Sequence, residues 1–231
     1  MVEKNCLSYW FPKIEDRVPV PETEWIKFSD GMDLMSVFGS SNSIFIIPLQ
    51  NFVLEAADKL GYPAFLRTGR TSAKHNFENA CFLEEDFDIS GHIQELLEYS
   101  HMVSPAGIAH DVWAVREFLE SEPVFHCQRY GNMPVVRERR YFVDGYNEQV
   151  LYSIPYWPKE ALKAGEPTKE NWEEDMEFLN SFPEEGAELA EEVSCCVDGQ
   201  WSVDVFEAND GLYVTDMALA QASYGWDESR V

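Results

Sequence analysis

Residues 63–75 read Pro-Ala-Phe-Leu-Arg-Thr-Gly-Arg-Thr-Ser-Ala-Lys-His. The apolar start of this stretch predicts a strand over residues 62–67, and the Gly, Ser and Thr residues that follow predict a loop over 68–74. The strand would deliver Arg67 and the loop Lys74, while the small residues would let backbone N–H groups approach phosphate oxygens. Because the spacing differs from that of a P-loop, Gly-x4-Gly-Lys-Ser/Thr, the stretch fits either a phosphate-binding loop or a polar surface turn.

The neighbouring segments predict further helices and strands. Apolar residues recur at helical spacing over residues 49–60, with Pro48 in the first turn and Gly61 after the last. A second helix is expected over residues 89–99, with Ser90 as its N-cap. Strands are expected at residues 44–47, 79–83 and 112–119, and extended chain at residues 9–12 and 18–23.

Residues 136–145 read Val-Arg-Glu-Arg-Arg-Tyr-Phe-Val-Asp-Gly, and the strand expected within this stretch would carry charges on both faces. Because alternate side chains of a strand share a face, Glu138, Arg140 and Phe142 would lie together, with the residues between them on the other face. In a chain so poor in bases, this pattern indicates that one face lines a cleft. The alternative is a basic edge strand that discourages pairing with other chains.

A hairpin is expected near the C-terminus, with strands at residues 200–206 and 212–218 joined by a turn at Asp210-Gly211. Asp204 and Asp216 lie at similar distances from this turn, so they would face each other across the strand pair. Two carboxylates so close repel unless a cation lies between them, and Mg²⁺ prefers carboxylate oxygens together with substrate phosphates. The pair therefore indicates a metal site, with two solvated acids as the alternative.

The remaining pattern predicts the fold class. Strands are expected at residues 124–130, 135–143 and 149–154, and helices at residues 169–181 and 183–193. Strands and helices mix without a regular βαβ alternation. This mixture predicts an α+β fold with mostly antiparallel sheets.

The charge is uneven along the chain. The 231 residues include 42 acidic and 17 basic side chains, a formal net charge of −25. Residues 141–231 hold 21 acids and four bases, whereas residues 67–140 hold eight of the 17 bases, which indicates that an anion is handled there. The overall charge excludes a general nucleic-acid binder and a protein that docks on an anionic membrane. Neither a signal peptide nor an apolar run of about 18 residues is found.

The cysteines and histidines do not predict a metal centre. The five cysteines are odd in number and scattered, with no Cys-x-x-Cys pair, so a zinc knuckle is not expected. Reduced thiols in a cytoplasmic protein are expected instead. The five histidines have no partners at i,i+4 spacing.

Taken in order along residues 60–220, these pieces resemble the ATP-grasp superfamily. They are most similar to its compact clade, common in phages and bacteria, and to the eukaryotic cell-division-cycle type proteins that assist assembly of a translation initiation factor. The matching pieces are Pro63-Ala64-Phe65-Leu66-Arg67-Thr68, Ser72-Ala73-Lys74-His75, Val115-Arg116-Glu117-Phe118, Glu138-Arg139-Arg140-Tyr141-Phe142, Val203-Asp204-Val205 and Val214-Thr215-Asp216-Met217.

The resemblance implies an α+β ATP-grasp fold, in which two lobes of mostly antiparallel sheet clamp a nucleotide. Residues 1–60 would be a shortened N-terminal segment, residues 61–119 the first lobe and residues 120–231 the second. The implied cofactors are ATP and Mg²⁺.

The resemblance also implies roles for single residues. Arg67 would contact the α- and β-phosphates in place of the usual lysine, and both cations suit a phosphate. Lys74 would bind phosphate from the loop that folds over it and take part in catalysis. Arg140 would be catalytic, facing the γ-phosphate or the acyl group. Asp204 and Asp216 would bind Mg²⁺.

The strand at residues 112–119 would supply the hinge that reads adenine. Glu117, Phe118 and Leu119 would do so through backbone hydrogen bonds, and Arg116 would bind the nucleotide beside them. Taken without the resemblance, the same stretch would be a core strand with its charged residues on the solvent face.

The function that the resemblance implies is an ATP-dependent carboxylate–amine ligase working through an acylphosphate. Its acceptor would be an unknown carboxylate, or a protein or peptide. One departure bears on turnover, because Ala218 stands where the family usually has an Asn metal ligand. The alternatives are a nucleotide-gated binding or assembly protein with little ligase activity, and an acidic module that mimics DNA through residues 170–192.

Overall fold

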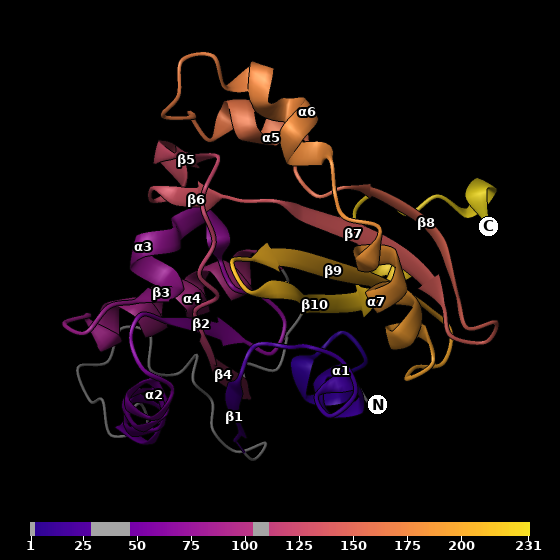
Figure 1. Ribbon diagram of the computed structural model, residues 1–231. Coiled ribbons are helices and arrows are strands. Elements are labelled where there is room, and N and C mark those ends of the chain that lie inside the picture. Colours follow the sequence, from indigo (N-terminus) through magenta and orange to yellow (C-terminus); the bar gives the residue numbers. More distant parts are fainter. Residues whose placement is uncertain (1–2, 29–46, 104–110) are drawn as a thin grey trace. The chain divides into compact units, whose positions relative to one another are not determined.

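The computed structural model describes residues 3–28, 47–103 and 111–231 (Figure 1). The chain divides into two compact units: unit 1 is Met1–Pro21 together with Leu119–Val231, and unit 2 is Glu22–Phe118. Residues 1–60, which the resemblance treats as one shortened segment, are divided between the two units after Pro21.

Unit 2 is built on a four-stranded antiparallel sheet with the strand order β1-β4-β2-β3. Its strands are β1 (Thr23–Lys27), β2 (Ala64–Thr68), β3 (Phe82–Leu83) and β4 (Val112–Glu117). Its helical segments are α2 (Ile47–Leu60), η3 (Lys74–Asn76), α3 (Phe77–Ala80) and α4 (Ile89–Val103), of which η3 is a 3₁₀ turn.

The helices α2 and α4 cover one face of this sheet. Leu66 of β2 and Val115 of β4 pack in one buried cluster with Leu49 and Val53 of α2 and Leu96 of α4. Because side chains alternate along a strand, every second residue of β2 and β4 points to the opposite face. That opposite face carries Arg67 and Arg116.

The sequence predicts α2 and its end correctly. The helix stops at Leu60, and Gly61 follows with a φ of +90°, a left-handed conformation that glycine adopts without steric cost. The Gly61 N–H donates to the Ala57 carbonyl at 2.9 Å. Of the strand expected at residues 44–47, Ile47 is the first residue of α2, and the rest lies outside the described residues.

Two local predictions in unit 2 are wrong. The strand expected at residues 79–83 is shorter, because the first part continues α3 and only Phe82–Leu83 pair with β2. Asp88, rather than Ser90, caps the N-terminus of α4. Its Oδ1 accepts a hydrogen bond from the Ser90 N–H at 3.1 Å, so Ser90 lies inside the first turn.

Unit 1 is built on a second four-stranded antiparallel sheet, with the strand order β10-β9-β7-β8. Its strands are β7 (Glu138–Asp144), β8 (Gln149–Pro155), β9 (Gln200–Ala208) and β10 (Gly211–Leu219), and a separate pair is β5 (Phe125–Cys127) and β6 (Met133–Val135). Its α-helices are α1 (Leu7–Ile14), α5 (Lys159–Ala164), α6 (Met176–Asn180) and α7 (Glu185–Ser194). Its 3₁₀ turns are η4 (Gln128–Tyr130), η5 (Trp172–Asp175), η6 (Ala220–Ala222) and η7 (Glu228–Arg230).

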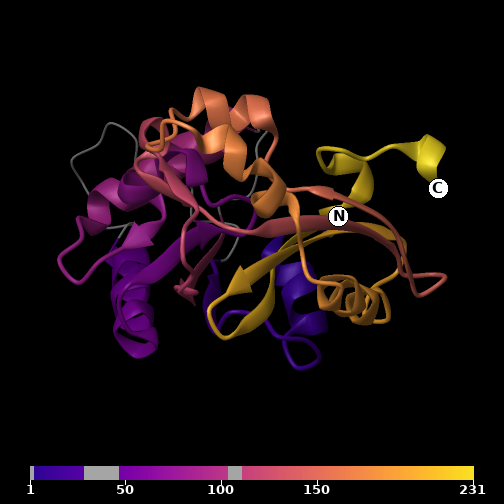
Figure 2. The same ribbon diagram turned by 45° about the horizontal axis from the view of Figure 1, so that its top comes forward.

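The helices α1 and α7 pack against one face of this second sheet (Figures 1 and 2). The ring of Tyr9 in α1 stacks on Trp201 of β9, with centroids 6.0 Å apart. Gly186 of α7 lies against Tyr141 of β7, where a side chain at residue 186 would collide with the phenol oxygen. The opposite face of the sheet carries Arg140, because its side chain alternates with that of Tyr141.

The opening of the chain is the main correction to the expected elements. Residues 9–12 are helical, not extended, and belong to α1 (Leu7–Ile14). Four buried apolar residues recur at the spacing of one helix face, and their burial outweighs the cost of Pro12 inside the helix. These residues are Leu7, Trp10, Phe11 and Ile14.

Three elements of unit 1 are shorter than expected. The helix expected at residues 169–181 is the 3₁₀ turn η5 followed by the short α6. The strand expected at residues 124–130 ends at Cys127, where η4 begins. The strand expected at residues 135–143 is divided between β6 and β7.

The structure bears on the state of the cysteines and on membrane-spanning helices. All five cysteines are free of disulfide bonds. Within the described ranges, none of the helices combines the length and the apolar character needed to cross a membrane.

Candidate functional site

Two arginines of unit 2 emerge on the same face of its sheet. The register of β2 and β4 pairs Arg67 with Ala114 and Phe65 with Arg116, so the arginines are diagonal neighbours on the face opposite α2 and α4. Each is only 3% exposed. Arg67 Nε donates to the Thr68 carbonyl at 3.1 Å, and Arg116 Nε donates to Thr23 Oγ1 at 3.0 Å. The strands therefore hold two cations in place away from the apolar core.

The loop after β2 is organised by Thr68. Its Oγ1 accepts from the N–H groups of Arg70 and Thr71, at 3.4 and 3.2 Å, and the Thr68 N–H donates to the Thr71 carbonyl at 2.9 Å. Lys74 then begins the turn η3 and is half-buried. Burial, followed by the positive charge of Lys74, lowers the pKa of His75. The loop thus has a defined turn geometry, and its contact with phosphate stays a prediction.

The predicted hinge lies at the end of β4. Glu117 pairs with Glu22 twice, donating its N–H to the Glu22 carbonyl at 2.9 Å and accepting from the Glu22 N–H through Oε1 at 2.8 Å. Phe118 packs against Phe82 and Phe77, with ring centroids 5.0 and 6.3 Å away. These three rings give the end of the sheet an apolar aromatic cluster, a surface of the kind that suits a planar base. Leu119 is the first residue beyond unit 2.

One row of side chains crosses the sheet of unit 1. The register pairs Arg140 of β7 with Asp204 of β9, and Asp204 with Asp216 of β10, so all three lie on the face opposite α7. The two acids face each other across the hairpin, as the sequence predicts. A bulge between Val214 and Asp216 brings Asp216 into this register.

Arg140 and Asp204 form a bidentate ion pair. Arg140 Nε lies 2.7 Å from Asp204 Oδ1, and Nη2 lies 2.7 Å from Oδ2. Burial alone would lower the pKa of Arg140, but the Asp204 carboxylate and its hydrogen bonds outweigh that effect and raise it. Removing one partner of such a buried pair typically costs about 3–5 kcal/mol, because the other charge is left uncompensated.

Arg140 has two further contacts that were not expected from the sequence. Its guanidinium lies 5.3 Å from the centroid of the Tyr156 ring, and its Nη1 donates to the Tyr224 carbonyl at 3.4 Å. A signal for Tyr156 does exist, because it follows β8, whose Ile154 is paired with Arg140. The C-terminal position of Tyr224 gives no such signal, since its contact depends on tertiary folding.

The two aspartates offer the kind of oxygen ligand that Mg²⁺ prefers, but they are only two side-chain ligands. Carboxylate oxygens are the ligands this ion prefers, and it keeps several waters. In the part of the chain that the structure describes, no group of three His, Cys, Asp or Glu side chains is placed to hold a metal. Ala218 lies opposite Ser202, so the position of the usual third ligand has no carboxamide. Magnesium binding at Asp204 and Asp216 stays a prediction.

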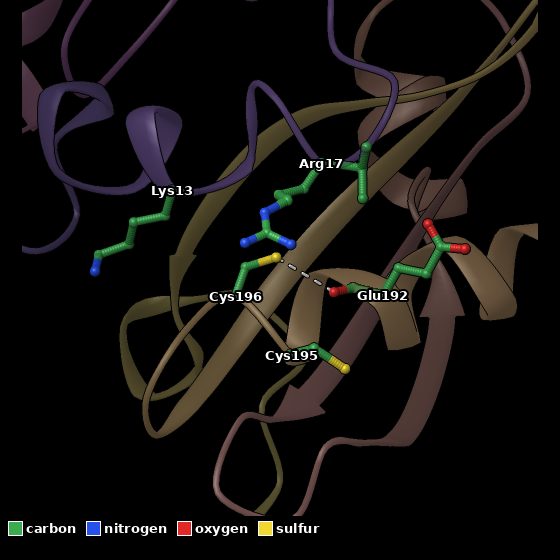
Figure 3. A pocket seen from close by; sticks show the side chains of 6 residues that line it. Lys13, Arg17, Glu192, Cys195 and Cys196 are labelled. Carbon is green, nitrogen blue, oxygen red and sulfur yellow. Dashed lines mark hydrogen bonds between the residues drawn. The ribbon is translucent and has the colours of Figure 1, made fainter.

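A separate pocket of about 470 Å³ lies in unit 1 where α1 and α7 end (Figure 3). It contains none of the predicted site residues. Cys196 Sγ points toward the guanidinium of Arg17 and donates to the Glu192 carbonyl at 3.5 Å, and Cys195 Sγ donates to the Glu191 carbonyl at 3.6 Å. Burial raises the pKa of the Cys196 thiol, with Arg17 opposing it. The two thiols therefore cap carbonyls in the last turn of α7.

No model of a protein family matches the sequence, and no curated protein does. Solved structures do match. A C-terminally truncated Cdc123 from Schizosaccharomyces pombe superposes with a TM-score of 0.60 and 12% identity, over 96% of this chain and 86% of that chain. Cdc123 from the same organism gives a TM-score of 0.58 at 12% identity, with the same coverage. An N5-carboxyaminoimidazole synthase from Aspergillus clavatus, in complex with ADP and 5-aminoimidazole ribonucleotide, gives a TM-score of 0.51 at 12% identity, over 93% of this chain and 43% of that chain.

The chain has an ATP-grasp fold. The α+β ATP-grasp class expected from the order of the motifs is thereby confirmed, as is the resemblance to proteins of the cell-division-cycle type. Because the identities are 12%, the likeness establishes the fold only. The role of each predicted site residue has to be argued from its own contacts and chemistry.

Proposed function

We propose that this chain binds ATP with Mg²⁺ and acts as an ATP-dependent ligase of the carboxylate–amine type. The observation that carries the proposal is the row of Arg140, Asp204 and Asp216 on one face of a sheet in an ATP-grasp fold. A cation and two carboxylates side by side match the needs of a phosphoryl group and its metal. In this proposal unit 2 is the first lobe and unit 1 the second.

The nucleotide would be bound mainly by unit 2. Arg67, Arg116 and Lys74 would neutralise the phosphates, for which two buried, strand-borne guanidinium groups are well suited. The backbone of Glu117, Phe118 and Leu119 would read adenine. The aromatic cluster that includes Phe118 supports this assignment, because a purine ring stacks favourably on apolar and aromatic surface.

The chemistry would take place at the row in unit 1. A substrate carboxylate would attack the γ-phosphorus, giving an acylphosphate and ADP, and an amine would then displace phosphate to form the amide bond. Arg140 would stabilise the charge that develops on the transferred phosphoryl group. Asp204 and Asp216 would hold Mg²⁺, which when bound neutralises phosphate charge.

The acceptor in this proposal is a small carboxylate or the carboxylate of a protein or peptide. We also propose a cytoplasmic location, which the five free thiols support.

The test of the ligase proposal is ADP release on mixing the protein with Mg²⁺, ATP and panels of acids and amines. Release that depends on both an acid and an amine supports a ligase. Asp216→Asn should lose at least tenfold in rate, because a carboxylate that binds the metal is removed. Full activity of this variant would show that the metal assignment is wrong.

A nucleotide-gated assembly protein with little ligase activity is the second candidate. Ala218, which removes the usual third metal ligand, favours it. Tight ATP binding without product across all acid and amine panels would select this second function over the first.

A further inference from the structure

Both oxygens of the carboxylate predicted to bind metal are already engaged. Asp204 accepts two charge-assisted hydrogen bonds from Arg140, each 2.7 Å long. The side chains of Arg140 and Asp204 are 18% and 5% exposed, so water competes little with this contact. A carboxylate in a bidentate pair with arginine offers few lone pairs to a second cation.

The sheet makes this pairing the resting arrangement of unit 1. Arg140, Asp204 and Asp216 are neighbours across three hydrogen-bonded strands, so the backbone register alone brings the guanidinium beside both acids. The Tyr156 ring and the Tyr224 carbonyl hold the guanidinium from other sides. Every one of these groups belongs to unit 1.

A divalent cation arriving alone would face two costs. It would approach the guanidinium closely, and like charges repel strongly where water is excluded. It would also take Asp204 from Arg140, leaving the guanidinium buried without its anion. A nucleotide removes both costs, because its phosphates offer Arg140 a new anion and offer the metal further oxygen ligands.

We propose that Arg140 closes the metal site of the free protein and that the nucleotide opens it. Arg140 would exchange Asp204 for a phosphate of the nucleotide, so that the divalent cation binds together with the nucleotide and not before it. The inference rests on the proposed function and adds the order in which its ligands bind.

Mn²⁺ is the probe for this order, read out as the enhancement of water-proton relaxation, which grows when the ion is immobilised on protein. Wild-type protein should give little enhancement with Mn²⁺ alone and a large one when a non-hydrolysable ATP analogue is added. Arg140→Met should bind Mn²⁺ alone at least tenfold more tightly than the wild type. The double variant Arg140→Met/Asp204→Asn should lose that gain, because the freed carboxylate is gone.

Arg137→Met is the matched control. Arg137 is ion-paired with Glu207, and its side chain is 20% exposed, close to the 18% of Arg140. Glu207 is 28% exposed, more than the 5% of Asp204. The substitution frees one carboxylate without a second acid opposite it. It should leave Mn²⁺ binding as in the wild type.

The inference is overturned if the wild type binds Mn²⁺ alone as tightly as Arg140→Met does, or as tightly as it does with the analogue. If Arg140→Met fails to fold by circular dichroism, the wild-type comparison with and without the analogue decides. Calorimetry of analogue binding distinguishes failure of the proposed function from failure of this inference. If the analogue does not bind at all, the proposed function is wrong. The Mn²⁺ affinities of Arg140→Met and Arg137→Met still decide whether Arg140 closes the metal site.

Discussion

Arg67, Arg116 and Arg140 are buried in a chain whose formal net charge is −25. A buried guanidinium is costly unless it is hydrogen-bonded, and each of the three has a bond within its own unit. Arg140 forms a bidentate contact with Asp204, Arg67 donates to the Thr68 carbonyl, and Arg116 donates to the Thr23 hydroxyl. In each unit, hydrogen bonds therefore offset part of the cost of burying a cation.

At the scale of one residue, Asp204→Asn tests how much the buried ion pair contributes to the free energy of unfolding. Replacing the carboxylate leaves Arg140 buried without its anion, so the free energy of unfolding should fall by about 3–5 kcal/mol. Urea denaturation measures the change. Glu166→Gln, which breaks the exposed 3.9 Å pair with Arg129, should change stability by less than about 1 kcal/mol. Equal effects of the two substitutions would contradict this view of Arg140.

His92 should make unit 2 less stable in mild acid. Burial lowers its pKa below 6.5, with the Ala80 carbonyl, Asp88 and Glu95 opposing the shift. As the pH falls through about 6.5, the unfolded chain takes up a proton that the folded His92 resists, so the free energy of unfolding decreases until the folded pKa is reached. Urea midpoints at pH 7.5 and 5.5 measure this, and His92→Gln should reduce the difference. An unchanged difference in that variant would contradict it.

At the scale of elements, the β7–β8 turn is held against the end of α7. A Cβ at Gly145 would lie 1.9 Å from the Val197 carbonyl oxygen. Because that oxygen belongs to the backbone, the backbone itself would have to move to relieve the clash. Gly145→Ala should therefore lower the free energy of unfolding by about 1–3 kcal/mol or more. Gly211→Ala, at the β9–β10 turn with nothing within 4 Å of the added atom, is the control and should stay near neutral. A neutral Gly145→Ala would contradict the close packing.

The elements that the sequence predicts well are those whose signals are local. The hairpin follows from Asp210-Gly211 between two apolar runs, and Asp204 and Asp216 are paired as that turn requires. The end of α2 follows from Gly61. The helix at residues 7–14 is missed because Pro12 is a strong local signal against it, while the burial that stabilises it depends on Trp201 and other residues far along the chain.

The Arg140–Asp204 pair marks the limit of such prediction for the candidate site. Strand alternation assigns Arg140 to a face, and the hairpin assigns Asp204 to a face, but only the pairing of β7 with β9 brings them together. These residues are 64 positions apart. Sheet order and register at that separation are set by tertiary packing, so the sequence predicts both residues without their contact.

At the scale of the whole chain, both units are acidic. Unit 1 holds 27 acids and 11 bases, and unit 2 holds 15 acids and six bases. Arg67, Arg116 and Arg140 stand out against this acidic composition, because each is a largely buried cation on the face of a sheet. Because an acidic chain repels anions in general, the proposed nucleotide would depend on these specific cations.

Calorimetric titration of ATP with Mg²⁺ into the protein tests the central claim most directly. We expect one binding site per chain, at least tenfold weaker binding for Arg67→Met and Lys74→Ala, and unchanged binding for Arg129→Ala, whose side chain is mostly exposed. Lys74→Ala serves where the buried Arg67→Met does not fold. No binding at millimolar ATP, or affinities for folded Arg67→Met and Lys74→Ala equal to that of the wild type, would contradict the claim that this chain is an ATP-binding protein of the ATP-grasp kind.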